Sequence, residues 1–449
     1  MNLKSLAKDT AIYGLSSIVG RFLNYLLVPI YTYKIAAESG GYGIVSNLYA
    51  YTALFLAILT FGMETTLFRF SNKDGKDPDK VYGTSLRMVG AVGLVFIALL
   101  MIFLSPIAGA MGYAAHPEYV GCMGIIVAFD AFQAIMFSRL RQQRRPVKFM
   151  LLKFAFIIPN ILLNLICTGL VFIGFAKELK GLALGFDRGL CKEMVKYTWP
   201  LLLFSLVGVL NQVADKILFP YLMPGKEGMV QLGIYGACVK IAMIMTLLVQ
   251  AFRYAYEPIV FNGSRDKNSP ETLADGTKWF AIFAILAFLA VVVYMPIVRH
   301  FIQPAYWDGL GVVPVVMMAE MFMGMYFNFS FWYKLNDQTW WGAVMNVIGA
   351  AVMIGVNIAL VPKIGYWACA WGGFAGYGTA MLLSYFIGQK KYPINYDMKS
   401  IFLFCAAGAV IFAAYRGLGR LGLSDVLCMV IGTVLLLGYA SLVWKAIKK

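Results

Sequence analysis

The sequence predicts an all-α membrane protein that crosses the bilayer many times, and two observations support this. Hydrophobic residues make up 61% of the 449-residue chain and charged residues only 13%, whereas soluble proteins carry about a quarter charged residues. The apolar residues also form stretches of about 20 residues, the length a helix needs to cross a hydrocarbon core ~30 Å thick. A membrane β-barrel is excluded, because its strands would alternate with a period of two over about ten residues.

Thirteen apolar stretches are long enough to form these helices. In chain order they lie at residues 10–34, 43–68, 82–111, 118–140, 147–175, 198–223, 230–256, 273–297, 310–333, 340–362, 365–388, 399–417 and 424–444. The sequence therefore predicts about 13 transmembrane helices.

Positive charge in the connecting segments predicts the orientation of these helices. The chain has a formal net charge of +16, and its lysines and arginines gather in one set of loops, whereas the opposite loops are short and nearly free of them. This asymmetry predicts a multi-pass protein of the cell inner membrane with a cytoplasmic N-terminus. It argues against nucleic-acid binding and for contact with anionic lipid head groups. The basic residues in question include Lys4, Lys8, Lys73, Lys76, Lys80, Arg139, Arg141, Arg144, Arg145, Lys148, Arg265, Lys267, Lys390, Lys391, Lys445, Lys448 and Lys449.

The chain resembles itself at an offset of about 190 residues, the kind of internal repeat on which many transporters are built. Arg21 and Asn24 precede Pro29 by eight and five residues, and Gln212 and Asp215 precede Pro220 by the same spacing. Asp130 and Glu320 are also 190 residues apart. We therefore expect an N-terminal transmembrane lobe at 1–197, a C-terminal lobe at 198–388, and two additional C-terminal helices within 389–449.

The repeat also predicts that the first lobe lacks one helix. The last helix of the second lobe, 365–388, has its expected counterpart near 175–198, but that stretch contains eight charged residues, which a membrane-spanning helix accommodates only at high cost. Two interpretations stay open: the sixth helix of lobe one is deleted, or the fifth apolar stretch does not cross the membrane.

Polar residues inside the predicted helices are the candidates for a binding site, because each needs a compensating interaction in lipid. Gln212 and Lys216 are four residues apart and share a helix face, and Arg21 and Asn24, three apart, do the same. A cavity lined by the cations Arg21 and Lys216 would suit an anionic substrate. We predict substrate contacts from Arg21, Asn24, Gln212, Lys216 and Lys240. The acids Glu64, Asp130, Asp215 and Glu320 are predicted either to bind a coupling ion or to brace the helices.

Patterns typical of enzymes are missing from the sequence. The chain has only two histidines, His116 and His300, and no nucleophile elbow, phosphate-binding glycine loop or metal-ligand cluster. We expect no catalytic residues, no cofactor and no metal.

Several segments resemble the polysaccharide-biosynthesis, O-antigen flippase-like branch of the multidrug/oligosaccharidyl-lipid/polysaccharide (MOP) exporter superfamily. They are AKDTAIYGLSSIVGRFLNYLLVPIYT at 7–32, GGYGIVSNLYAYTALFLAILTFGMETTLFRF at 40–70, DAFQAIMFSRLRQQRRPVKF at 130–149, and FDRGLCKEMVKYTWPLLLFSLVGVLNQVADKILFPYLM at 186–223. The resemblance implies two bundles of six helices, two added C-terminal helices and a central cationic cavity. Arg21 matches the family's cavity cations, with Lys216 and Lys240 as looser counterparts. The expected total of 14 helices exceeds the 13 stretches by one.

The resemblance implies a flippase that moves undecaprenyl-pyrophosphate-linked oligosaccharides across the inner membrane by alternating access, for surface polysaccharide biosynthesis. Its expected partners are that anionic lipid-linked oligosaccharide, membrane lipids and glycan assembly proteins. Three alternatives stay open at this point. The chain could be a cation-coupled multidrug exporter of the same fold, a homologue inactivated by the missing helix, or a membrane glycosyltransferase. The last is disfavoured because no loop exceeds about 25 residues.

Overall fold

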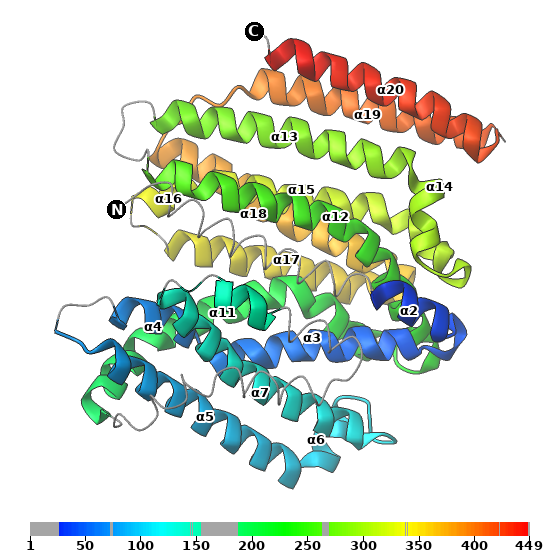
Figure 1. Cartoon of the computed structure of the whole chain (residues 1–449). Helices are drawn as coiled ribbons and strands as arrows, with labels where there is room; N and C mark the ends of the chain where they lie inside the picture. The colour runs from blue at the N-terminus through cyan, green and yellow to red at the C-terminus, as the bar shows by residue number, and fades with distance from the viewer. Residues whose placement is uncertain are drawn as a thin grey trace. The chain divides into compact units, whose positions relative to one another are not determined.

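The computed structural model describes residues 27–71, 75–143, 145, 147–153, 187–262, 269–336, 338, 340–421 and 423–447 (Figure 1). Regular structure in these ranges is helical throughout, with sixteen α-helices and three short 3₁₀ helices. The described residues divide into two compact units, one within Val45–Pro220 and the other formed by Val28–Ile44 and Tyr221–Lys449.

The first unit is built from most of α3 (Gly41–Thr60) together with α4 (Met63–Ser71), α5 (Pro78–Ile102), α6 (Leu104–Ala110), α7 (Pro117–Gln142) and most of α11 (Arg188–Leu222). Helices α5 and α7 pack along each other, and α4 packs on both. Proline occupies the first position of α5 and of α7, where its missing N–H leaves no bond unmade. The Asp77 carboxylate accepts the Asp79 N–H and caps α5.

Among the described residues, the second unit contains more helices than the first, and α18 packs against several of them. In chain order its elements are α2 (Leu27–Lys34), η1 (Ala37–Ser39), α12 (Lys226–Asn262), α13 (Ser269–Val293), α14 (Met295–Val298), η3 (Arg299–Phe301), η4 (Pro304–Val312), α15 (Val313–Phe329), α16 (Phe331–Leu335), α17 (Trp340–Ile364), α18 (Trp367–Lys391), α19 (Met398–Arg420) and α20 (Asp425–Ile447). Helix α18 packs along α17 and α15, and α13 lies beside the pair α19 and α20 (Figure 1).

Small residues make the α17–α18 contact close. They recur at every fourth position of α18 and are buried there: Ala368, Gly372, Gly376, Ala380, Ser384 and Gly388. A Cβ atom on Gly376 would lie 2.7 Å from the backbone oxygen of Gly349 in α17. Small residues with this spacing allow two helix backbones to approach each other in a membrane.

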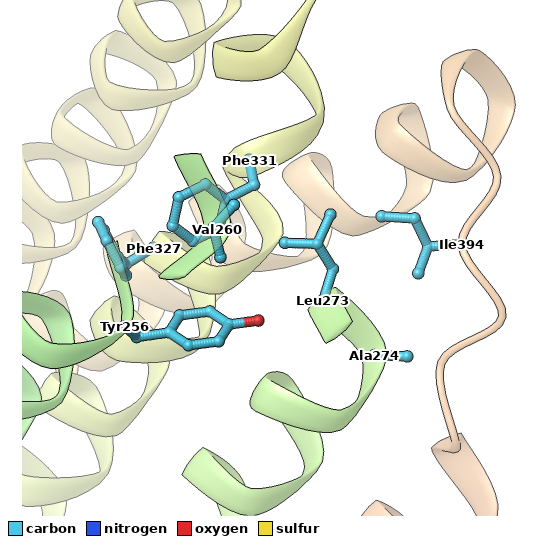
Figure 2. Packing of buried hydrophobic residues seen from close by; sticks show 7 residues of the cluster. All are labelled: Tyr256, Val260, Leu273, Ala274, Phe327, Phe331 and Ile394. Atoms are coloured by element: carbon cyan, nitrogen blue, oxygen red, sulfur yellow. The ribbon is translucent and has the colours of Figure 1, made fainter. Parts of the chain in front are cut away.

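A cluster of buried hydrophobic residues packs together in the second unit, as Figure 2 shows. Its buried members are Tyr256 and Val260 of α12, Leu273 and Ala274 of α13, Phe327 of α15, Phe331 of α16, and Ile394 in the segment between α18 and α19. The Tyr256 hydroxyl is satisfied within this cluster, because it donates a hydrogen bond to the Thr272 backbone oxygen at 2.8 Å.

Among the described residues, nine helices are long and apolar enough to cross a membrane. They fall on nine of the thirteen stretches expected from the sequence: 43–68, 82–111, 118–140, 230–256, 273–297, 310–333, 340–362, 399–417 and 424–444. The stretches at 198–223 and 365–388 are also helical, as α11 and α18, but are not among the nine. Those at 10–34 and 147–175 lie largely outside the described residues. The total of thirteen and the internal repeat therefore stay predictions.

Helix α11 overlaps the charged stretch where the internal repeat would place a sixth helix of the first lobe. It begins at Arg188 and has 35 residues, which at ~1.5 Å per residue makes it roughly 50 Å long, longer than a ~30 Å hydrocarbon core. Its charged first turns can therefore lie outside the core. The Asp187 carboxylate accepts the Leu190 N–H at 3.0 Å, and this bond lowers the pKa of Asp187. Residues 154–186 lie outside the described part, so the missing helix and the lobe boundaries at 197 and 388 stay predictions.

Candidate functional site

Helix α11 carries a compact polar group made of Gln212, Asp215 and Lys216. The Lys216 ammonium group donates to both carboxylate oxygens of Asp215 at 3.2 Å and contacts the Gln212 backbone oxygen at 3.4 Å. The Asp215 side chain is 8% exposed and that of Lys216 is 19% exposed. The sequence predicted that Gln212 and Lys216 share a helix face. The pairing with Asp215 means that an incoming anion would compete with this carboxylate for the ammonium group.

Two residues that the sequence did not single out hold the backbone of this group. Asn47 of α3 donates its amide hydrogen to the Lys216 backbone oxygen at 2.7 Å. Tyr113, in the connection between α6 and α7, donates its hydroxyl hydrogen to the amide oxygen of Asn47 at 2.6 Å. Both side chains are buried, at 1% and 5% exposure. Asn47, Tyr113 and Lys216 all belong to the first unit.

Glu64, predicted as a coupling-ion or bracing acid, lies in an ion pair. It is in the first turn of α4 and accepts hydrogen bonds from Arg141 at 2.5 Å and from Ser138 at 3.1 Å, both on α7. Arg139, next to this pair, is buried and forms an ion pair with Asp79. These contacts connect α7 to α4 and α5 in the first unit.

Asp130, another of the acids predicted to bind a coupling ion or brace the helices, is half-buried near the middle of α7. Lys153 attracts its carboxylate electrostatically, while the same ammonium group lies over the Phe137 and Phe149 rings at 5.2 and 5.8 Å. Gln133, one turn from Asp130, is buried, and its amide nitrogen has no hydrogen-bond partner in the described residues. A carboxylate and an amide therefore share one face of α7.

The remaining predicted site residues are distributed elsewhere. Lys240 of α12 and Glu320 of α15 are half-buried and belong to the second unit. Arg21 and Asn24 lie outside the described residues. The structure thus brings together Gln212, Asp215 and Lys216 of the predicted set. Within the ranges that the structure describes, no three His, Cys, Asp or Glu side chains form a group that could hold a metal ion.

Several solved transporter structures share this fold. The structure of a lipid II flippase, MurJ, in an inward closed conformation matches with a TM-score of 0.74 and 14% identity, over 99% of this chain and 100% of that one. An inward-facing multidrug resistance MATE transporter of the MOP superfamily matches with a TM-score of 0.66 and 13% identity, over 85% and 94% of the two chains. A MOP superfamily transporter from Pyrococcus furiosus gives 0.54 and 15%, over 85% and 95%.

The chain therefore shares the fold of solved transporters, one of them from the MOP superfamily. Residues 6–261 match the family described as polysaccharide biosynthesis protein, which is more than half of the chain. The chain belongs to this family. A comparison with curated proteins finds no match. The resemblance to a polysaccharide-biosynthesis family stated from the sequence is confirmed.

Proposed function

We propose that the protein is a flippase that moves an undecaprenyl-pyrophosphate-linked oligosaccharide across the inner membrane by alternating access. One observation carries the proposal: a member of the polysaccharide biosynthesis family has, over 99% of its length, the fold of a lipid II flippase. The function of lipid II flippase belongs to that solved protein alone. The substrate class comes to this chain through its family and through the chemistry of the α11 group.

The α11 group offers a cation to a phosphate. A lysine ammonium group is a strongly hydrated point charge that binds phosphate oxygens well, and Lys216 is only partly exposed, so an ion pair there is screened less than one on a surface. In the absence of substrate, Asp215 holds this ammonium group. A pyrophosphate with several negative charges displaces a single carboxylate, and the freed Asp215 then becomes available to a proton or a coupling cation.

Binding of a soluble lipid pyrophosphate tests this exchange. With farnesyl pyrophosphate as the probe and the full chain in detergent, Lys216→Gln should weaken binding by about 10- to 100-fold, the range expected when one charge-assisted hydrogen bond is lost. Lys216→Arg keeps the charge and should bind nearly as the native chain does. Asp215→Asn removes the competing charge and should tighten binding. If Lys216→Gln binds the probe like the native chain, Lys216 is not an anion ligand.

Arg21 provides a second test that rests on the sequence. Arg21→Ala should lower the amount of cell-surface glycan in cells that depend on this protein, because the substrate would lose one of its cations. Normal glycan from well-expressed Arg21→Ala protein would remove Arg21 from the site.

A multidrug exporter of the same fold is the competing function, because MATE transporters share this architecture. A drug cation would need the acid rather than the lysine of the α11 group. For such an exporter Asp215→Asn should abolish binding of a lipophilic cation dye, and Lys216→Gln should leave it intact. The two functions therefore predict opposite roles for neighbouring residues.

A further inference from the structure

Helix α11 contains a proline that removes one bond from its backbone ladder. In an α-helix the carbonyl of one residue accepts the N–H of the residue four positions later. Pro220 has no N–H, so the Lys216 carbonyl lacks its helical donor, although α11 continues to Leu222. A buried carbonyl with no donor is costly, and more so within a membrane.

Asn47 supplies that missing donor from another helix. Its amide hydrogen reaches the Lys216 carbonyl oxygen at 2.7 Å, and a carbonyl can only accept, so the amide nitrogen must face α11. The amide oxygen then faces Tyr113, whose hydroxyl hydrogen-bonds it at 2.6 Å. Tyr113 is itself held by its own backbone N–H, which donates to the Ala108 oxygen at 2.7 Å. The donor is thus oriented before it meets α11.

Residue 216 is consequently held by side chains at both ends of its backbone unit. Its N–H donates to the Asp215 carboxylate at 2.8 Å, and its C=O accepts from Asn47. The direction of a side chain follows from the backbone that carries it. A shift of the backbone at 216 would therefore redirect the ammonium group and change its distance from the carboxylate at 3.2 Å.

We propose that Asn47, oriented by Tyr113, is a positioning residue that fixes the α11 backbone at Lys216 and thereby aims the ammonium group at a lipid-linked pyrophosphate. The proposal rests on the function proposed above. A purely structural role would satisfy the same carbonyl, but it would affect stability without a specific effect on anion binding.

Pro220 offers a direct way to separate the two roles. Pro220→Ala restores a backbone N–H that can donate to the Lys216 carbonyl and makes the Asn47 amide dispensable there. If Asn47 acts through this carbonyl, the effect of Asn47→Leu on binding should largely disappear in the Pro220→Ala background. Such non-additivity is the signature of two residues that act on one group.

The experiment measures the affinity of the purified full chain for farnesyl pyrophosphate, together with its thermal stability. Asn47→Leu should weaken binding about tenfold and Tyr113→Phe about threefold, as expected when one hydrogen bond no longer orders the ligand group. Asn47→Leu with Pro220→Ala should bind within about twofold of Pro220→Ala alone. Asn357→Leu is the matched control, because Asn357 of α17 is also fully buried, and its affinity should equal that of the native chain.

Three outcomes would decide against the proposal. If Asn47→Leu and Tyr113→Phe bind normally while Lys216→Gln loses binding, the positioning role is wrong and the proposed function stands. If Pro220→Ala does not suppress the effect of Asn47→Leu, Asn47 does not act through the carbonyl. If Lys216→Gln binds normally, the proposed anion site itself fails. Should Asn47→Leu not fold, Tyr113→Phe, which removes one oxygen atom, gives the same test.

Discussion

Gly376→Ala should weaken the packing of α18 on α17. The added Cβ atom would lie 2.7 Å from the Gly349 backbone oxygen and 2.9 Å from the Met353 Cβ atom. A backbone oxygen cannot rotate away as a flexible side chain can, so the two helices must separate. Forcing one methyl group into such a contact costs about 1–3 kcal/mol. Alanine in a helix regains about 0.5–1 kcal/mol relative to glycine, which leaves a net loss on the order of 1 kcal/mol.

Gly355→Ala is the matched control on α17. A Cβ atom there meets nothing within 4 Å, so only the gain in helix propensity remains, and this variant should be neutral or slightly stabilised. Thermal unfolding of the purified full chain in one detergent measures both variants. Since membrane proteins often unfold irreversibly, the half-life at a fixed temperature should be compared as well. The reasoning is refuted if Gly376→Ala is as stable as Gly355→Ala.

Three further substitutions probe the ends of helices. Arg139→Met should destabilise the chain by about 1–2 kcal/mol, because the ion pair between the buried Arg139 and Asp79 is lost. The loss is limited because the half-exposed Asp79 carboxylate can be hydrated instead. Arg141→Met, which breaks a more exposed pair, should cost less than 1 kcal/mol, and equal losses in chemical denaturation would contradict this ranking. Asp397→Ala should cost about 0.5 kcal/mol, since Asp397 caps α19 through the Ser400 N–H but is largely solvated.

The cap at Asp397 also predicts a pH dependence. The hydrogen bonds from Ser400 hold the pKa of Asp397 below its usual value. A carboxylate whose pKa is lowered by folding stabilises the native chain above its unfolded pKa, and this contribution is lost as the pH falls through the folded pKa. The stability difference between Asp397→Ala and the native chain should therefore be present at neutral pH and disappear in acid. A difference that grows as the pH falls would contradict the assignment.

Helices and their approximate ends could be predicted because hydropathy is a local property. The stretches at 340–362 and 424–444 correspond closely to Trp340–Ile364 and Asp425–Ile447. The start of α11 at Arg188 could not be predicted in this way. A helix that continues into water keeps its backbone bonds but carries charged residues, so hydropathy marks the edge of the apolar part and not the end of the helix.

The site was predictable only where its residues are neighbours in sequence. Gln212 and Lys216 are four residues apart, so their shared helix face followed from the sequence. Pro220 signals that the Lys216 carbonyl lacks a donor, but nothing local indicates which residue supplies one. Asn47 lies 169 residues earlier in the chain, and its contact depends on how α3 packs against α11. Likewise, Glu64 stood out as an acid in an apolar stretch, while its partner on α7 became apparent only from the folded structure.

Transport in a defined system tests the proposed flippase. Purified protein would be reconstituted into liposomes with a fluorescent undecaprenyl-pyrophosphate-linked oligosaccharide, and the fraction of label that becomes accessible to a membrane-impermeant quencher would be followed over time. The native chain should accelerate the transfer relative to protein-free liposomes, and Lys216→Gln should slow it. If the native chain transfers the lipid no faster than protein-free liposomes but moves a lipophilic cation dye, the protein is an exporter of another kind.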